Sequence, residues 1–86
     1  MDKPLHDRVE HIETRMDLVA FIEDLHKDCL RNGVSWENHD LASYLGALAS
    51  WTEDMEGAYR NRGLELPAVP SWKTFAEILL AATIYE

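Results

Sequence analysis

Apolar residues recur along this chain with the spacing of α-helices, in three strong patterns and one weaker pattern. The first strong pattern lies between Thr14 and Gly33, and its apolar positions are Leu18, Phe21, Ile22, Leu25 and Cys29. At about 100° per residue these positions fall on one face, which predicts an amphipathic helix. Thr14 followed by Asp17 is typical of a capping box. We expect Gly33 to end this helix in a left-handed conformation.

The second strong pattern follows Asp40, a residue type that often caps helix N-termini. One face of the predicted helix carries Leu41, Tyr44, Leu45, Leu48, Trp51, Thr52, Met55 and Tyr59. Gly46 and Gly57 lie on the opposite side, where each glycine costs up to about 1 kcal/mol relative to alanine. We therefore expect another segment to pack closely there. Gly63 is suited to the C-terminal end of this helix.

The third strong pattern predicts a last helix from Trp72 to Tyr85, capped by Ser71. Its main face carries Phe75, Ala76, Leu79, Ala82 and Thr83, while Ile78, Leu80 and Ile84 point to other sides. A helix that is apolar nearly all round is buried on several sides. Two interpretations stay open: a second copy of the chain covers the extra side chains, or other segments of the same chain cover them.

The weaker pattern lies at the N-terminus, where Pro4 suits the first turn of a helix. Leu5, Val9 and Ile12 make a narrow apolar stripe, so residues 1–13 form either a short helix or a partly extended arm.

The segment from Leu64 to Pro70 connects the last two predicted helices. Its two prolines favour an extended backbone. Their P-x-x-P spacing lacks the adjacent basic residues that ligands of SH3-type domains carry. We therefore expect the apolar residues of this segment to pack over the helices; they are Leu64, Leu66 and Val69.

Together these patterns predict a single all-α domain over residues 1–86, with three or four helices and a proline-containing crossover before the last helix. We expect the core to contain the residues at the centre of each stripe: Leu25, Leu45, Leu48, Phe75 and Leu79. Cys29 is expected to be a small buried hydrophobe. Trp51 and Trp72 are expected in the core or at its edge.

Charge adds one feature to this picture, because the net charge of −8 is concentrated in the middle of the chain. Residues 37–57 hold five acids and no base: Glu37, Asp40, Glu53, Asp54 and Glu56. Two interpretations stay open, a solvated surface or a face that attracts a basic partner. The negative charge argues against binding to nucleic acids or anionic membranes.

The compartment is indicated by three features of the sequence. No run approaches the ~20 apolar residues of a membrane span. The N-terminus is too polar for a signal peptide, and a chain with one cysteine suits a reducing compartment. We therefore expect a cytoplasmic protein.

Candidate chemistry is sparse. Glu23 and His26 have the E-x-x-H spacing of helical di-iron sites, but such a site needs a second copy and two further glutamates. Asp54 and Glu56 are two residues apart on a predicted helix, so they do not face each other. The sequence contains no nucleophile motif, phosphate-binding loop or zinc motif. We assign no catalytic residue, no cofactor and no metal ligand, and we expect a protein that is not an enzyme.

Trp36 lies in the predicted connection before the second strong helix. A tryptophan in such a place either seals one end of a helical bundle or presents its ring to a partner, and the sequence leaves both interpretations open.

Four motifs resemble those of a known family: Trp36-Glu37-Asn38, Leu41-x-x-Tyr44-Leu45-x-Ala47-Leu48-x-x-Trp51, Pro67-x-x-Pro70-x-Trp72 and Ile78-Leu79-Leu80-Ala81-Ala82-x-x-Tyr85-Glu86. With them, over about residues 12–86, the chain resembles a family of small uncharacterised bacterial proteins. The resemblance implies a compact helical domain of bacterial or phage origin. It implies no activity, because none is established for the family. Colicin-type immunity proteins are similar in size and acidity, but their recognition-loop motif does not occur here, so that comparison indicates only that the physical class suits an inhibitor.

The leading functional hypothesis is a non-enzymatic protein-interaction module, in its sharpest form an immunity or inhibitor protein that binds a basic partner. One alternative is a homodimeric structural or regulatory helical protein. Another is a small enzyme or metal protein. The candidate interaction residues are Trp36, Glu37, Asp40, Glu53, Asp54, Glu56, Leu80 and Ile84.

Overall fold

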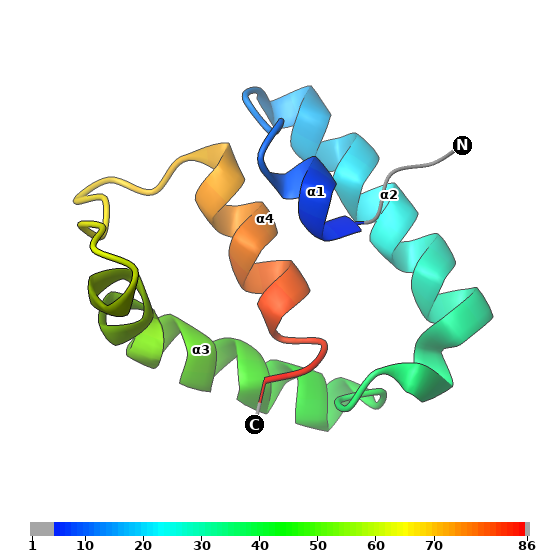
Figure 1. Ribbon diagram of the computed structural model, residues 1–86. Coiled ribbons are helices and arrows are strands. Elements are labelled where there is room, and N and C mark those ends of the chain that lie inside the picture. The colour runs from blue at the N-terminus through cyan, green and yellow to red at the C-terminus, as the bar shows by residue number, and fades with distance from the viewer. Residues whose placement is uncertain (1–4, 86) are drawn as a thin grey trace.

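Four α-helices and one short 3-10 helix make up the computed structural model, which describes residues 5–85 (Figure 1). The elements are α1 (Leu5–Val9), α2 (Arg15–Asn32), η1 (Gly33–Ser35), α3 (Leu41–Asn61) and α4 (Trp72–Ala81). No strand occurs in the described part of the chain, so the predicted all-α fold is confirmed, with four helices. The helix start predicted at Pro4 lies outside the described residues.

Side-chain caps begin the three long helices at the positions that the sequence indicates. At α2 the Asp17 backbone N–H donates to Thr14 Oγ1 at 3.0 Å, and the Thr14 N–H donates to Asp17 Oδ2 at 3.1 Å. Asp40 accepts a hydrogen bond from the Ser43 N–H at 2.8 Å at the start of α3. Ser71 makes a capping box at the start of α4. These caps satisfy N–H groups that have no partner inside the helix.

The C-terminal ends of the helices follow the sequence predictions less closely than the N-terminal ends. Gly63 follows α3 with a φ of +72°, as expected for a left-handed end. Gly33 was predicted to do the same after α2, and this is wrong, because its φ is −57°. The chain continues instead into η1, where the Trp36 N–H donates to the Gly33 carbonyl at 3.0 Å. The last helix ends at Ala81 rather than at Tyr85, and a turn follows it.

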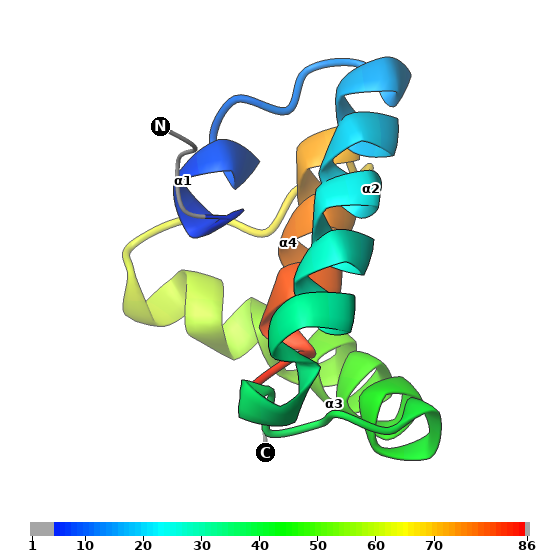
Figure 2. The ribbon, with the colours of Figure 1, turned by 90° about the vertical axis from the view of Figure 1, so that its right-hand side faces the viewer.

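Helix α4 lies at the centre of the arrangement. It packs against α1, α2 and α3, whereas α2 and α3 do not pack against each other within residues 5–85. Figures 1 and 2 show α2 and α4 side by side, with α3 crossing at the end where α4 terminates. Because only α4 packs against both α2 and α3, the other side of the space between these two helices stays open.

The core has one main cluster, between α1, α2 and α4. Its buried members are Val9, Ile12, Leu18, Phe21, Leu25 and Ala76. Phe21 and Ala76 have no exposed surface at all. A further set of apolar residues is buried where α3 meets the end of α4: Ala47, Met55, Tyr59 and Ala82. The buried residues of α4 are Thr74 and Ala76, and Ala82 follows directly after the helix. These side chains are small, which lets the neighbours of α4 approach closely.

The predicted core is only partly right. Leu25 is buried, and Leu48 and Leu79 are half-buried. The prediction is wrong for Leu45 and Phe75, because these residues are 54% and 43% exposed. Both lie on apolar stripes, but α3 contacts α4 through another part of its stripe and α2 does not reach α3.

Three further predictions of burial or close packing differ from the structure of the described residues. Cys29 is exposed rather than buried. A Cβ placed on Gly46 or Gly57 would have no atom within 4 Å, so no segment packs closely against that side of α3. The connection between α3 and α4 leaves Leu64 and Val69 exposed and Leu66 half-buried, so it covers the helices less than predicted.

The N-terminal stripe supplies the cover that the connection does not. Val9 and Ile12 are buried in the main cluster, and Leu80 of α4 is half-buried against it. Two ion pairs hold this segment in place, one between Arg8 and Asp24 and one between Glu10 and Lys73. Of the extra apolar residues on the last predicted helix, Ile84 remains 64% exposed.

Truncation of Phe21 tests the position of the core. We expect Phe21→Ala to lower the free energy of unfolding by about 3–5 kcal/mol, because it empties a fully buried site among three helices. Val34→Ala is the matched control, since Val34 is 91% exposed and its truncation should change stability by less than about 0.5 kcal/mol. Chemical denaturation measures both. Equal midpoints for the two variants would show that the core lies elsewhere.

Candidate functional site

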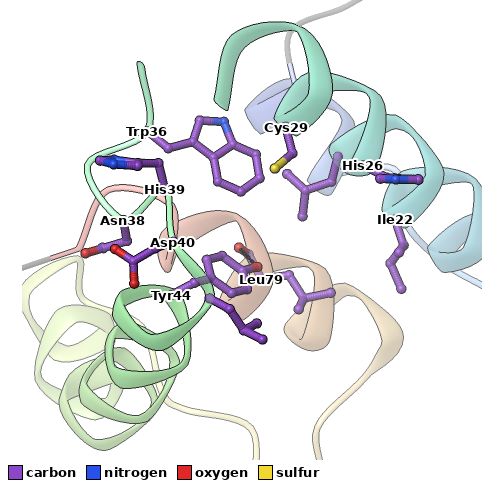
Figure 3. A pocket seen from close by; sticks show the side chains of 11 residues that line it. Ile22, His26, Cys29, Trp36, Asn38, His39, Asp40, Tyr44 and Leu79 are labelled. Carbon is purple, nitrogen blue, oxygen red and sulfur yellow. Dashed lines mark hydrogen bonds between the residues drawn. The ribbon is translucent and has the colours of Figure 1, made fainter. Parts of the chain in front are cut away.

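An apolar groove of about 400 Å³ opens between α2 and α3, above α4 (Figure 3). We call it the α2–α3 groove. The residues that line it are Ile22, Leu25, His26 and Cys29 of α2, Trp36, Asn38, His39 and Asp40 of the connection, Leu41 and Tyr44 of α3, and Leu79 of α4. Asp40 is the one acid among these lining residues, and none of them is a lysine or arginine. The groove exists because α2 and α3 each pack on α4 and not on each other.

Exposed apolar side chains lengthen the groove along its walls. Within the lining, Ile22 is 43% exposed and Leu41 is 72% exposed. Leu45 lies one turn after Leu41 on α3, and Phe75 lies one turn before Leu79 on α4, so each shares a helix face with a lining residue. Because both are also exposed, the apolar surface continues beyond the groove itself.

Two anchored aromatic residues form one end of the groove. The Trp36 indole Nε1 donates to Asp28 Oδ2 at 2.8 Å, and the ring centroids of Trp36 and Tyr44 are 5.9 Å apart. The Tyr44 hydroxyl donates to the Leu79 carbonyl at 2.7 Å. Burial raises the pKa of Tyr44, so this hydroxyl stays protonated and available as a donor. Trp36 is therefore half-buried at one end of the groove, where its ring lines the groove surface.

Asn38 fixes the connection to the end of the chain. Its side-chain Nδ2 donates to the carbonyls of Ala82 and Tyr85, at 3.0 and 2.7 Å, and its backbone N–H donates to the Thr83 carbonyl at 3.1 Å. The Tyr85 ring in turn packs edge-on against Trp51, with centroids 5.3 Å apart. Sequence reasoning missed this role, because the partners lie 44 and 47 residues away and no local pattern indicates them.

The Trp-Glu-Asn stretch thus divides into two structural residues and one surface residue. Trp36 and Asn38 hold the connection against α2 and the C-terminal turn. Glu37, between them, is exposed beside the groove.

The five acids of residues 37–57 do not form one free acidic face. Asp40 caps α3, and the backbone N–H of Ser43 lowers its pKa. Asp54 accepts a hydrogen bond from the Tyr85 hydroxyl, and Glu56 lies 3.2 Å from Arg60 in an i,i+4 pair. Glu37 and Glu53 are exposed. Three of the five acids therefore take part in local contacts, and Asp40 alone lines the groove.

Leu80 and Ile84 belong to a different depression, on the side of α4 that faces α1. This second cavity, of about 940 Å³, lies between α1, the C-terminal half of α3 and α4. Leu80 and Ile84 line it together with Trp51 and Glu77. The predicted interaction residues are therefore not one site, because Trp36 and Asp40 line the α2–α3 groove instead.

The second cavity contains a buried polar cluster around Glu77. The Tyr59 hydroxyl donates to Glu77 Oε2 at 2.9 Å, and the Arg62 guanidinium lies 4.9 Å from the centroid of the Tyr59 ring. Arg62 Nη2 is also 3.5 Å from Glu77 Oε1, close enough for attraction but without hydrogen-bond geometry. Burial, and then the hydrogen bond to Glu77, raise the pKa of Tyr59 to about 12.

Within residues 5–85, no group of three or more histidine, cysteine, aspartate or glutamate side chains is arranged to hold a metal ion. None of the described helices combines the length and apolarity that a membrane crossing requires.

Fold and groove together define a small all-α domain with an open apolar surface between two of its helices. The chain belongs to DUF7660, a family of unknown function whose sequence pattern matches residues 14–86. The match begins at the residue that caps α2, so α1 lies outside it. No curated protein matches the chain, and no solved structure does.

Replacement of Asn38 tests the contact between the connection and the C-terminal turn. We expect Asn38→Ala to lower the free energy of unfolding by about 1–3 kcal/mol, because two carbonyls lose their donor. Hydrogen exchange should also quicken at residues 82–85. Asn61→Ala, at an exposed asparagine, is the control. Unchanged exchange in the C-terminal turn of Asn38→Ala would contradict this role.

The raised pKa of Tyr59 predicts a loss of stability at high pH. An unfolded tyrosine has a pKa of about 10, so between pH 10 and 12 the unfolded chain loses this proton while the folded chain keeps it. The stabilising contribution is therefore complete below pH 10 and is lost as the pH rises towards 12. We expect the free energy of unfolding, measured with denaturant at each pH, to fall less steeply in Tyr59→Phe. Equal slopes for both proteins would refute the assignment.

Proposed function

We propose that this chain is a non-enzymatic protein-interaction domain and that the α2–α3 groove is its binding surface. The observation that carries this proposal is the exposure of apolar side chains on three helices around one depression, with Leu41 72% and Leu45 54% exposed. Monomeric proteins seldom expose large contiguous apolar surfaces, and such surfaces often mark interaction sites. The cost of leaving these residues in water is balanced if a partner covers them.

The polar groups of the groove favour binding over catalysis. A general acid or base must reach a substrate proton, and a nucleophile needs a base beside it. Here the Tyr44 hydroxyl is bonded to the Leu79 carbonyl and the Asp40 carboxylate caps α3. Asn38 is held by the C-terminal turn. These three groups shape the groove. His26, His39 and Cys29 also line it, and in the described part of the chain neither imidazole is hydrogen-bonded to the Cys29 thiol. The apolar side chains are therefore the main contact surface.

The partner that we propose is a basic protein in the bacterial cytoplasm, with inhibition or immunity as the sharpest form of this function. The net charge of −8 supports it, because opposite charges speed association and add specificity. The free thiol of Cys29 at the groove also suits a reducing compartment.

The experiment compares two leucines that differ in position but not in kind. Leu45→Asp places a charge on the face of α3 that continues the groove one turn beyond Leu41. Leu64→Asp does so at a leucine of the connection between α3 and α4, which is 53% exposed and lines another depression. Wild type and Leu64→Asp are expected to retain the same protein from a lysate of the source organism, and Leu45→Asp is expected to lose it. The captured protein is then purified and titrated against all three chains.

Two results would contradict the proposal. One is equal binding of the purified protein to wild type and Leu45→Asp, which would place the interface elsewhere. The other is equal loss in both variants, which would indicate non-specific adhesion of apolar surface.

A further inference from the structure

The helices around the α2–α3 groove present their side chains in rows with helical spacing. On α2, Ile22, His26 and Cys29 line the groove at positions i, i+4 and i+7. On α3 the row is Leu41 and Leu45, and on α4 it is Trp72, Phe75 and Leu79. Rows of this kind are the ridges between which the ridges of another helix pack. The groove therefore has the surface relief of a helix-binding site.

The backbone of the groove walls excludes one other mode of binding. An extended peptide that adds a strand needs unpaired N–H and C=O groups along an exposed edge. Seven of the eleven lining residues lie on α2, α3 and α4, whose backbone groups are hydrogen-bonded within the helices. The other four lie in the connection between Trp36 and Asp40, which forms no strand. A helix satisfies its own backbone groups, so it needs only side-chain contacts from these walls. From Trp72 to Leu79 the α4 row extends about 10 Å, enough for two turns of a bound helix.

Charge around the groove indicates what flanks the apolar face of that helix. Asp40 lies in the lining, Glu37 is exposed next to the lining residues Trp36 and Asn38, and Glu23 is exposed on α2, one turn from His26. Lys27 and Arg31 of α2 are on another side, where they line a depression together with Arg8. Next to the lining, the rim of the groove is thus acidic at Glu23, Glu37 and Asp40, and the complement of these carboxylates is basic.

We infer that the α2–α3 groove binds an amphipathic α-helix of a partner protein, with lysine or arginine residues along the edges of its apolar face. This inference rests on the proposed function and deepens it. The apolar face fills the groove between Ile22, Leu41 and Phe75, and the basic edges lie against Glu23, Glu37 and Asp40. The bound helix takes the position beside α4 that no described segment of the chain occupies.

Selection from a displayed library of random peptides tests the inference with the full chain. The library is first depleted of peptides that bind Leu45→Asp. The remaining peptides are then selected for binding to wild type. We expect the selected peptides to carry apolar residues at i, i+4 and i+7 with lysine or arginine beside them. Their affinity, measured by fluorescence anisotropy, should fall about tenfold or more in Leu45→Asp and stay within about twofold in Leu64→Asp.

A second variant separates the charge from the apolar contact. Glu37→Lys, at an exposed position, should weaken the binding of the basic peptides. It should leave the binding of acidic counterparts of these peptides unchanged or make it stronger. The effect should shrink as salt is raised, since the Debye length falls to about 3 Å at 1 M.

Three other results would overturn the inferred partner, the proposed function or both. Selected peptides without helical spacing, or with acidic edges, would overturn the inferred partner and leave the binding groove in place. Failure to select any peptide that distinguishes wild type from Leu45→Asp would overturn both the partner and the proposed function. A wild-type dimer in sedimentation that Leu45→Asp converts to a folded monomer would identify a second copy of the chain as the occupant.

Discussion

The packing of α4 against its three neighbours is the interaction on which the rest of the structure depends. Ala76 and Ala82, fully buried, mark close contacts of this part of the chain, and small side chains there allow short distances between helices. Both α2 and α3 pack on α4, and neither packs on the other in the described part of the chain. The α2–α3 groove is a direct consequence of this arrangement, because a fourth long helix would be needed to close it. The short helix α1 covers the opposite region and completes the main cluster there.

The connection between α2 and α3 gives the groove a fixed end. Trp36 is tied to Asp28, and Asn38 is tied to the C-terminal turn. Because these hydrogen bonds join segments that are far apart in sequence, the groove wall does not depend on one loop alone. A surface held in place in this way loses little conformational freedom when a partner binds, which favours affinity. The same bonds give the Trp-Glu-Asn stretch a structural role and leave Glu37 exposed.

Sequence patterns predicted the features that neighbouring residues determine. The caps at Thr14, Asp40 and Ser71 are such features, since each depends on a residue three positions away. Burial was harder, because an apolar stripe shows which face of a helix packs but not how much of it a neighbour covers. Phe75 and Leu45 were therefore placed in the core although α4 and α3 leave them exposed. Of the candidate residues, Trp36 and Asp40 line the groove and Leu80 and Ile84 line another cavity, a division that tertiary packing determines.

An open α2–α3 groove leaves the methyl groups on its walls accessible to solvent in the free protein. Nuclear magnetic resonance with a soluble paramagnetic agent measures this exposure for each methyl group in the free protein. The account predicts strong relaxation of the Leu41 and Leu45 methyl groups and of the Ile22 methyl groups, and weak relaxation of those of Leu25. Protection of Leu41 and Leu45 equal to that of Leu25 would contradict the account, because it would mean that the space between α2 and α3 is closed in solution.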